Sequence, residues 1–207
     1  MSFDAHAIHP QSGRVPGTRA RAAPPAGVRN TATTLSPAVS RSPAASRPRI
    51  EGYGIPKSKR GMVSWEDVSG AFAGAPRYWI ATTDPDGAPH VQQHWGVFVD
   101  RRFFFEGGPN TRWARNLARI PRAVVTAERL GLAIMLEGSV RAMTPDATLA
   151  DRLVKGYGRK YQRTDAYTPS PKNWANDGLR EVTPVRGFAW RYRDFIRSAT
   201  RFTFARS

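Results

Sequence analysis

The sequence predicts one β-dominated α+β domain, an antiparallel barrel or sandwich with a few short helices. Short runs rich in aromatic and β-branched residues recur from residue 78 onward, and turn signals separate most of them. Helical periodicity is confined to a few short segments. No glycine pattern typical of a Rossmann fold or a P-loop is present. Strands at this spacing, mainly in hairpins, argue against a doubly wound parallel sheet.

The strand segments follow one another closely. The run RYWIATT ends in DPDGAP, a strong turn signal, and Asp100-Arg101 forms a tight turn between the next two runs. A further turn is expected around Arg129 to Gly131, and the last two runs read as a closing strand pair. The expected strands are 77–83, 90–100, 101–107, 122–128, 133–143, 187–192 and 199–205.

Two longer segments are expected to be helical. Residues 64–75 form an amphipathic lead-in with Ser64 as the N-cap. Residues 144–161 place Leu149, Leu153 and either Gly156 or Tyr157 on an inward face. Residues 162–182 are polar and aromatic with prolines, which predicts a long ordered loop.

Composition divides the chain into two parts. Residues 1–50 are rich in Ala, Pro, Ser and Arg without apolar periodicity, and such a composition cannot bury enough surface to offset its conformational entropy. We therefore expect a disordered basic tail over 1–50 and one folded domain over 51–207. The tail is open to three interpretations: a solvated extension, a basic arm for anionic partners, or a leader removed or absent in the working protein.

Charge and cysteine content narrow the function. The net charge is +16, but residues 1–60 hold 10 Lys or Arg and only 2 Asp or Glu, so half of the excess lies in the expected tail. This distribution argues against nucleic acid as the main partner of the folded part. The chain has no cysteine and no apolar run long enough to span a bilayer, which predicts a soluble cytoplasmic protein without disulfides or a membrane anchor.

The stretch FEGGPNTRWARNL, residues 105–117, carries most of the functional argument. A strand stops at Gly107-Gly108-Pro109 and a helix opens near Asn110 or Thr111. Glycines allow close backbone approach, and the free N–H groups of a helix N-terminus attract anions. A threonine hydroxyl and a guanidinium at that end would add donors for a phosphate. Spacing alone leaves a phosphate cradle, a nucleic-acid-binding helix and a solvated surface helix all open.

The helix that follows is expected to have two faces. Spacing assigns one set of residues to the core and the other to solvent. The core set is Trp113, Leu117 and Ile120, and the solvent set is Arg112, Arg115, Asn116 and Arg119.

The sequence predicts neither a metal site nor a hydrolytic active site. His90 and His94 share a face with Gln92 on an expected strand, and at about 3.3 Å per residue they stand roughly 13 Å apart, too far to chelate one ion. No Ser-His-Asp or paired-carboxylate pattern stands out, so Glu106 and Glu137 are interpreted as structural. We expect no metal site and no protein nucleophile.

These motifs together resemble the pyridoxamine 5'-phosphate oxidase-like family of split β-barrel flavoproteins, in particular its flavin- and deazaflavin-dependent oxidoreductase branch. The resemblance rests on aromatic-Ile-Ala-Thr, Pro-Asp-Gly-x-Pro-His, Trp-Gly-Val, a Gly-rich turn followed by Thr-Arg-x-Ala-Arg-Asn-Leu, and Leu-Glu-Gly. It covers roughly residues 52–207, including the closing strand pair. It implies a homodimer of split antiparallel β-barrels of the FMN-binding type, with a flavin in each groove between subunits.

The resemblance also implies roles for single residues. Thr111 and Arg112 match residues that hold the cofactor phosphate, and Trp113 stands where the family commonly has a phosphate-binding lysine. Trp190 and Arg201 match residues that reach across from the partner subunit. Arg197 matches the contact to a substrate phosphate. The strand beside the flavin chain and ring is matched by Gln92, Gln93, His94 and Trp95.

Departures from the family pattern shape the expected function. Gln92 and Val97 replace basic residues of the oxidase, and Ala199 replaces its substrate histidine. These changes favour an oxidoreductase that uses FMN, or alternatively the 8-hydroxy-5-deazaflavin coenzyme, on a small molecule other than a vitamin B6 phosphate. A non-catalytic flavin- or haem-binding sensor or carrier is the rival interpretation. Trp95 and Trp190 are expected beside the ring, and Trp174 is a candidate cover for the groove.

Overall fold

The computed structural model describes residues 42–205. The expected tail therefore lies outside the described residues as far as Arg41. Its last part is described, and Ala44–Ser46 forms the short strand β1, which pairs antiparallel with β9 (Thr200–Thr203). The sheet thus begins before the boundary expected at residue 50, because β9 offers a free edge to a segment that has no strand pattern of its own.

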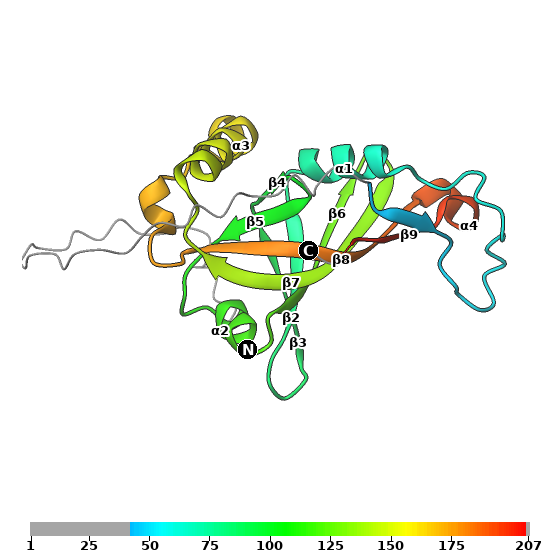
Figure 1. The fold of residues 1–207 in the computed structure, drawn as a ribbon, viewed down its shortest axis with the longest axis horizontal. Helices are drawn as coiled ribbons and strands as arrows, with labels where there is room; N and C mark the ends of the chain where they lie inside the picture. Colours follow the sequence, from blue (N-terminus) through cyan, green and yellow to red (C-terminus); the bar gives the residue numbers. More distant parts are fainter. Residues whose placement is uncertain (1–41, 206–207) are drawn as a thin grey trace, which may run out of the picture. The chain divides into compact units, whose positions relative to one another are not determined.

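The described residues form a β-dominated α+β fold, as expected from the sequence, and its antiparallel sheet has nine strands where seven were expected (Figure 1). The main path runs β1-β9-β8-β7-β6-β2-β3, and every strand pairing is antiparallel. The remaining strands have these bounds: β2 Tyr78–Thr83, β3 Pro89–His94, β4 Val97–Val99, β5 Arg102–Glu106, β6 Arg122–Arg129, β7 Leu132–Met143 and β8 Leu179–Arg191.

The long strand β8 divides the sheet. Its first residues pair with β5, residues 186–189 pair with β9, and β7 accompanies it along its whole length. A bulge between Glu137 and Gly138 bends this pair, and a Cβ at Gly138 would lie 2.4 Å from the Thr183 carbonyl oxygen, so only glycine fits there. The sheet branches at β8 and is not closed.

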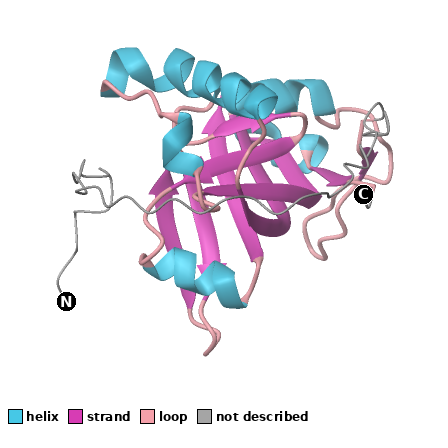
Figure 2. Ribbon diagram, turned by 60° about the vertical axis from the view of Figure 1, so that its left-hand side comes forward, coloured by secondary structure: helices cyan, strands magenta, loops and turns pink. Residues whose placement is uncertain are grey.

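Helices cover the sheet at several places (Figure 2). Their bounds are α1 Trp65–Gly74, α2 Arg112–Arg119, α3 Ala147–Asp165 and α4 Phe195–Ser198, with 3-10 turns η1 at Pro171–Trp174 and η2 at Tyr192–Asp194. The predicted N-cap at Ser64 is confirmed, since its side chain accepts from the Asp67 N–H. None of the helices in residues 42–205 has the length and apolarity to cross a bilayer.

Two sequence expectations need correction. The single strand expected over 90–100 is two strands, β3 and β4, because both backbone polar groups of Gly96 are bound by α3 side chains: its N–H donates to the Tyr161 hydroxyl at 3.0 Å, and its carbonyl accepts from Lys160 at 2.9 Å. The loop expected over 162–182 contains the last turn of α3, η1 and the start of β8.

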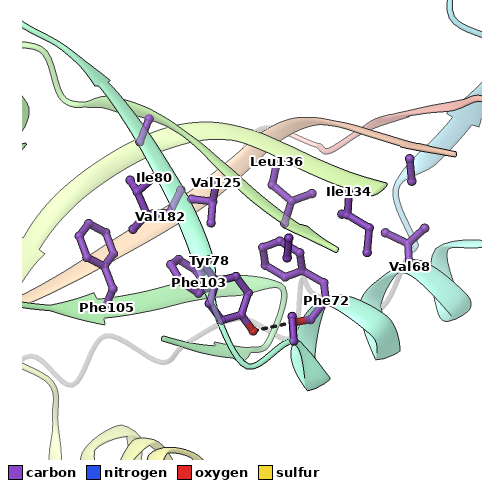
Figure 3. Close-up of a cluster of buried hydrophobic side chains, with 14 of the residues drawn as sticks. Val68, Phe72, Tyr78, Ile80, Phe103, Phe105, Val125, Ile134, Leu136 and Val182 are labelled. Atoms are coloured by element: carbon purple, nitrogen blue, oxygen red, sulfur yellow. Dashed lines mark hydrogen bonds between the residues drawn. The ribbon is translucent and has the colours of Figure 1, made fainter. Parts of the chain in front are cut away.

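Side chains gather in two cores. The larger core lies between the sheet and helices α1 and α2, where Figure 3 shows the Tyr78 hydroxyl donating to the Phe72 carbonyl at 2.6 Å. The smaller core packs α3 and η1 on β4, β5 and the start of β8 through Phe104, Tyr157 and Trp174. These buried aromatics hold the two ends of the sheet rigidly, which positions the segments described next.

Arg47 ties the described N-terminal segment to the closing strands. Its guanidinium donates to the carbonyls of Arg197 at 2.6 Å, Ala199 at 3.1 Å, Ser58 at 2.8 Å and Arg60 at 2.6 Å. We expect Arg47→Ala to lower the free energy of unfolding by about 1–3 kcal/mol, because charged hydrogen bonds to these carbonyls are lost. Urea denaturation checks this value, and Arg49→Ala, an exposed neighbour, serves as the control with an effect near zero.

Candidate functional site

The N-terminus of α2 follows the Gly-Gly-Pro turn as the sequence predicts. Thr111 is the N-cap: its hydroxyl oxygen accepts from the Ala114 N–H at 3.4 Å, and its hydroxyl donates to the Gly108 carbonyl at 2.9 Å. The first turn of the helix contains no acidic residue. The positive end of the helix dipole is therefore not compensated from within the helix.

Arg112 leans from this helix end toward the β2–β3 turn. Its side chain is half exposed, and Nη2 lies 2.9 Å from Asp84 Oδ2. The hydrogen bond from Arg112 holds the pKa of Asp84 below its ordinary value, and the backbone of Ala88 donates to the same carboxylate at 2.9 Å. The β2–β3 turn thus holds the Asp84 carboxylate in position, and this carboxylate orients the Arg112 guanidinium.

A pocket of about 410 Å³ lies along this side of α2. Three arginines and one carboxylate line it, so its wall carries a net positive charge. Its lining residues are Asp84, Pro85, Arg112, Arg115, Asn116, Ala118 and Arg119.

The four β3 candidates do not form one wall. Gln92 and His94 alternate with the exposed Gln93, so the first two lie on the inward face and Gln93 on the outward face. Trp95 follows the end of β3 and stacks on Tyr161, with ring centroids 5.4 Å apart. The structure therefore places Trp95 against α3 and divides the other three between the two faces of the sheet.

His94 lies in an apolar pocket beneath α2. Its ring contacts Phe105 and Trp113, each at a centroid distance of 5.1 Å. Burial, together with the charge of His90, lowers the pKa of His94 to about 4, although a hydrogen bond to the Glu106 backbone opposes this shift. Within residues 42–205, the buried Nε2 atoms of His90 and His94 have no hydrogen-bond partner. The His94 imidazole is therefore neutral near pH 7.

This burial makes stability depend on pH. As the pH falls from about 6.5 to about 4, the unfolded chain binds a proton at position 94 that the folded chain does not bind. The free energy of unfolding should fall by about 3 kcal/mol in total over this range because of His94. Denaturation of the protein and of His94→Phe at pH 7.5 and 5 checks this. An equal loss in both proteins would contradict it.

The α2 faces differ from the sequence expectation at two positions, Asn116 and Ile120; Ile120 was assigned to the core but is the C-cap and only partly buried. Trp113 and Leu117 are buried as predicted. Asn116 was assigned to the solvent face but is 3% exposed, and its side-chain amide donates to the Thr82 hydroxyl at 3.1 Å. Asn116 lies three residues after Trp113, so its side chain shares the buried face of α2.

The remaining candidates lie at the other end of the sheet (Figure 1). Trp190, near the end of β8, packs edge-on against Phe195 at 5.7 Å. Arg201 is partly buried on β9 and donates through Nε to the Ser46 hydroxyl at 3.1 Å. Arg197 is exposed on α4. Within one chain, these three residues are therefore grouped together but separated from Thr111 and Arg112.

Trp174, a candidate cover for the groove from the sequence, lies instead in the smaller core. Trp174 is fully buried, and its indole N–H donates to Glu106 at 2.5 Å, while the Tyr167 hydroxyl also donates to this carboxylate. Burial raises the pKa of Glu106. The structural interpretation of Glu106 fits these contacts, since its carboxylate joins the 166–178 segment to β5.

Lys160 was missed by sequence reasoning. Its Nζ donates to the Tyr78 hydroxyl at 2.7 Å and lies 4.5 Å from the centre of that ring. Burial, with the charges of Arg129 and Arg77, lowers its pKa to about 7. The signal was available, because Lys160 follows Leu153 by seven residues and so continues the inward face of its helix.

The chain is similar to known proteins in both sequence and fold. The family model described as pyridoxamine 5'-phosphate oxidase matches residues 65–193, more than half of the chain. This protein belongs to the pyridoxamine 5'-phosphate oxidase-like family. The match spans α1, the sheet from β2 through β8, and the α2 terminus.

Solved structures of low sequence identity share the fold of this chain. A conserved hypothetical protein from Mycobacterium tuberculosis is 22% identical with a TM-score of 0.52, and the match covers 67% of this chain and 91% of that one. A Bacteroides thetaiotaomicron protein, assigned provisionally to 5-nitroimidazole antibiotic resistance, is 14% identical with a TM-score of 0.51 over 79% and 92% of the two chains. No significant match is found among curated proteins.

One departure from the pyridoxamine 5'-phosphate oxidase-like pattern has a structural reason. Trp113, which the sequence resemblance sets where the family commonly has a lysine, is 1% exposed and packs on Phe105. A Cβ at Gly107 would lie 2.8 Å from its ring, so the turn before α2 fits closely over the indole. Trp113 thus supports the turn from below. Among residues 42–205, no group of three or more His, Asp or Glu is placed to hold a metal ion.

Proposed function

We propose that this protein is a cytoplasmic flavin-dependent oxidoreductase. It transfers a hydride between FMN and a small molecule other than a vitamin B6 phosphate. The observation that carries the proposal is the N-terminus of α2, with its Thr111 cap, Arg112 at the first helical position and no acidic residue in the first turn. This set of groups fits the dianionic phosphate of FMN.

The fit extends to the charges around the terminus. Arg112 is half exposed and reachable, and its partner Asp84 lies on a turn at the surface. A bound phosphate would accept hydrogen bonds from the Arg112 guanidinium, either together with the Asp84 carboxylate or in its place. Arg115 also lines the adjacent pocket and adds positive charge. Trp113 contributes by holding the Gly107 turn in shape, not by touching the phosphate.

The proposed site needs a second copy of the chain. Trp190, Arg197 and Arg201 lie apart from α2 within one chain, so they would complete the groove of the partner subunit. The outward faces of β2 and β3 present Trp79 and Val91, which are 51% and 54% exposed, on neighbouring strands. Large exposed apolar side chains that lie together favour a protein interface. This surface therefore supports the proposed homodimer.

The chemistry of this site would come from the cofactor. Bound FMN accepts or donates a hydride, and the protein supplies placement and electrostatics. Thr111 and Arg112 would hold the phosphate end, while Gln93 on the outward face of β3 and Trp190 would lie along the flavin. The exposed Arg197 would attract an anionic substrate. Ala199 offers no imidazole there, which is the reason for excluding a vitamin B6 phosphate.

A variant on β9 tests the shared groove. We expect Arg201→Ala to weaken FMN binding by about tenfold, because a charged hydrogen-bond donor from the partner subunit is lost. Fluorescence titration with FMN measures the affinity. Ser46→Ala is the matched control, since it removes the Arg201 hydrogen bond within the chain but keeps the guanidinium. Normal FMN affinity in Arg201→Ala would count against the shared groove.

Turnover separates an oxidoreductase from a carrier. The FMN-loaded protein should consume NADH or NADPH when a nitroaromatic or quinone acceptor is supplied, and consumption should stop when FMN is removed. Saturable FMN binding with no consumption of either donor would favour the non-catalytic carrier. Binding of the deazaflavin coenzyme in place of FMN would keep the phosphate site and change the cofactor.

A further inference from the structure

We propose that the cavity between β4 and α3 binds a small organic anion with an aromatic or similarly apolar body. The cavity has a volume of about 760 Å³, which lies in the range of small-molecule sites. It shares no lining residue with the pocket beside α2. The inference therefore stands independently of the proposed flavin site.

One wall of the cavity is apolar and firmly supported. Phe98 and Val99 of β4 and Val154 of α3 contribute to this part of the lining. Behind this wall, the Phe98 ring packs edge-on against Phe72 at 5.2 Å and Trp65 at 6.4 Å. Phe98 is thus held by the larger core, while Val99 and Val154 pack on the smaller core, so the apolar part of the lining is held in place before a ligand binds.

The opposite wall carries an excess of positive charge. Arg152, Lys155 and Arg159 project from successive turns of α3 into the lining. Arg152 forms a two-pronged pair with Asp100 at 2.6 and 2.8 Å, and Lys155 pairs with Asp151 at 2.7 Å.

Arg159 differs from its two neighbours. Among residues 42–205, no ion pair is seen for its guanidinium. One cation therefore remains to recognise an anionic group of a ligand.

A glycine keeps the cavity open. Gly158 lies in the lining, and a Cβ at this position would meet nothing closer than Gln162 Oε1 and the Thr168 hydroxyl oxygen, both at 3.8 Å. Glycine inside a helix costs about 1 kcal/mol relative to alanine, so neither packing nor helix stability calls for glycine here. Its missing side chain instead leaves volume beside two polar groups that can hydrogen-bond to a ligand.

The test uses two dyes of similar shape and different charge. The anionic probe is 8-anilinonaphthalene-1-sulfonate, and the neutral probe is N-phenyl-1-naphthylamine. Each is titrated into the full-length protein and followed by fluorescence, with and without saturating FMN. We expect saturable binding of the anionic dye, unaffected by FMN, with at least about tenfold higher affinity than the neutral dye.

Two variants locate the binding. Gly158→Leu should fill the cavity and weaken binding of the anionic dye by at least about tenfold. The unfolding midpoint of this variant should stay at or above that of the parent protein. Gly70→Leu is the matched control: Gly70 lies on α1 with no atom within 4 Å of a Cβ, and dye binding should be unchanged. Arg159→Glu should lower the affinity for the anionic dye and leave the affinity for the neutral dye nearly unchanged.

Two results would overturn the proposed anion site. Unchanged affinity for the anionic dye in both Gly158→Leu and Arg159→Glu would overturn the proposal, because the dye would then bind elsewhere. Displacement of the dye by FMN would also overturn it, by assigning the binding to the flavin groove. Failure of FMN to bind at all would leave the dye result standing and would bear only on the proposed oxidoreductase function.

Discussion

Replacing Arg112 with alanine is expected to weaken FMN binding by about 10- to 100-fold. A charged hydrogen bond to a phosphate contributes about 1.5–3 kcal/mol, which corresponds to this range of dissociation constants. The effect should be large because Arg112 is the first residue of α2 and the first turn of this helix contains no acidic residue. Fluorescence quenching of FMN during titration measures the change directly.

Arg119→Ala provides the control for Arg112→Ala. Both arginines line the pocket beside α2, and both belong to the same helix, but Arg119 is its last residue and lies away from the positive end. Its removal lowers the general positive charge by the same amount and should change FMN affinity less than about threefold. Equal losses in the two variants would show that only the overall charge of the helix matters, and the phosphate cradle would be wrong.

The largest expected loss of stability comes from Trp174→Ala. Truncation of a fully buried aromatic side chain costs about 3–5 kcal/mol through lost packing and the cavity left behind. The indole packs near Tyr157 and donates to Glu106, so the carboxyl group also loses one of its two side-chain donors. Urea denaturation should show the smaller core, with η1 and the C-terminal part of α3, loosening at much lower denaturant.

Trp174→Phe separates packing from hydrogen bonding. Phenylalanine keeps most of the apolar volume but cannot donate to Glu106, so we expect a loss of about 1–3 kcal/mol from the unpaired buried carboxyl group. A phenylalanine variant as stable as the parent protein would mean that the Glu106 contact is dispensable. An alanine variant that unfolds at the parent midpoint would contradict the packing of Trp174.

The strands and the main helices could be predicted because their signals are local. The turn at Asp100-Arg101, where both residues have positive φ, and the Ser64 cap each depend on a few adjacent residues. The first half of β8 escaped prediction because Arg180, Glu181 and Pro184 interrupt its apolar pattern. Glu181 is buried there only because Arg141 and Arg102, distant in the sequence, pair with it.

The candidate site shows the same limit. Local spacing predicted that Thr111 would begin a helix after a glycine turn, and the structure confirms it. The partner of Arg112 could not be predicted, since Asp84 lies on a different hairpin. The break at Gly96 likewise depends on Lys160 and Tyr161 of a distant helix. Interactions between elements far apart in the chain decide these features, and no local pattern encodes them.

The most direct measurement is a titration of the purified full-length protein with FMN, after an absorbance spectrum has shown whether a cofactor is already bound. The proposal predicts saturable binding of FMN with a submicromolar to micromolar dissociation constant, about −8 kcal/mol or stronger, which Arg112→Ala weakens and Arg119→Ala does not. Absence of saturable binding of both FMN and the deazaflavin coenzyme would contradict it, and α2 would then be a capped surface helix with a charged face.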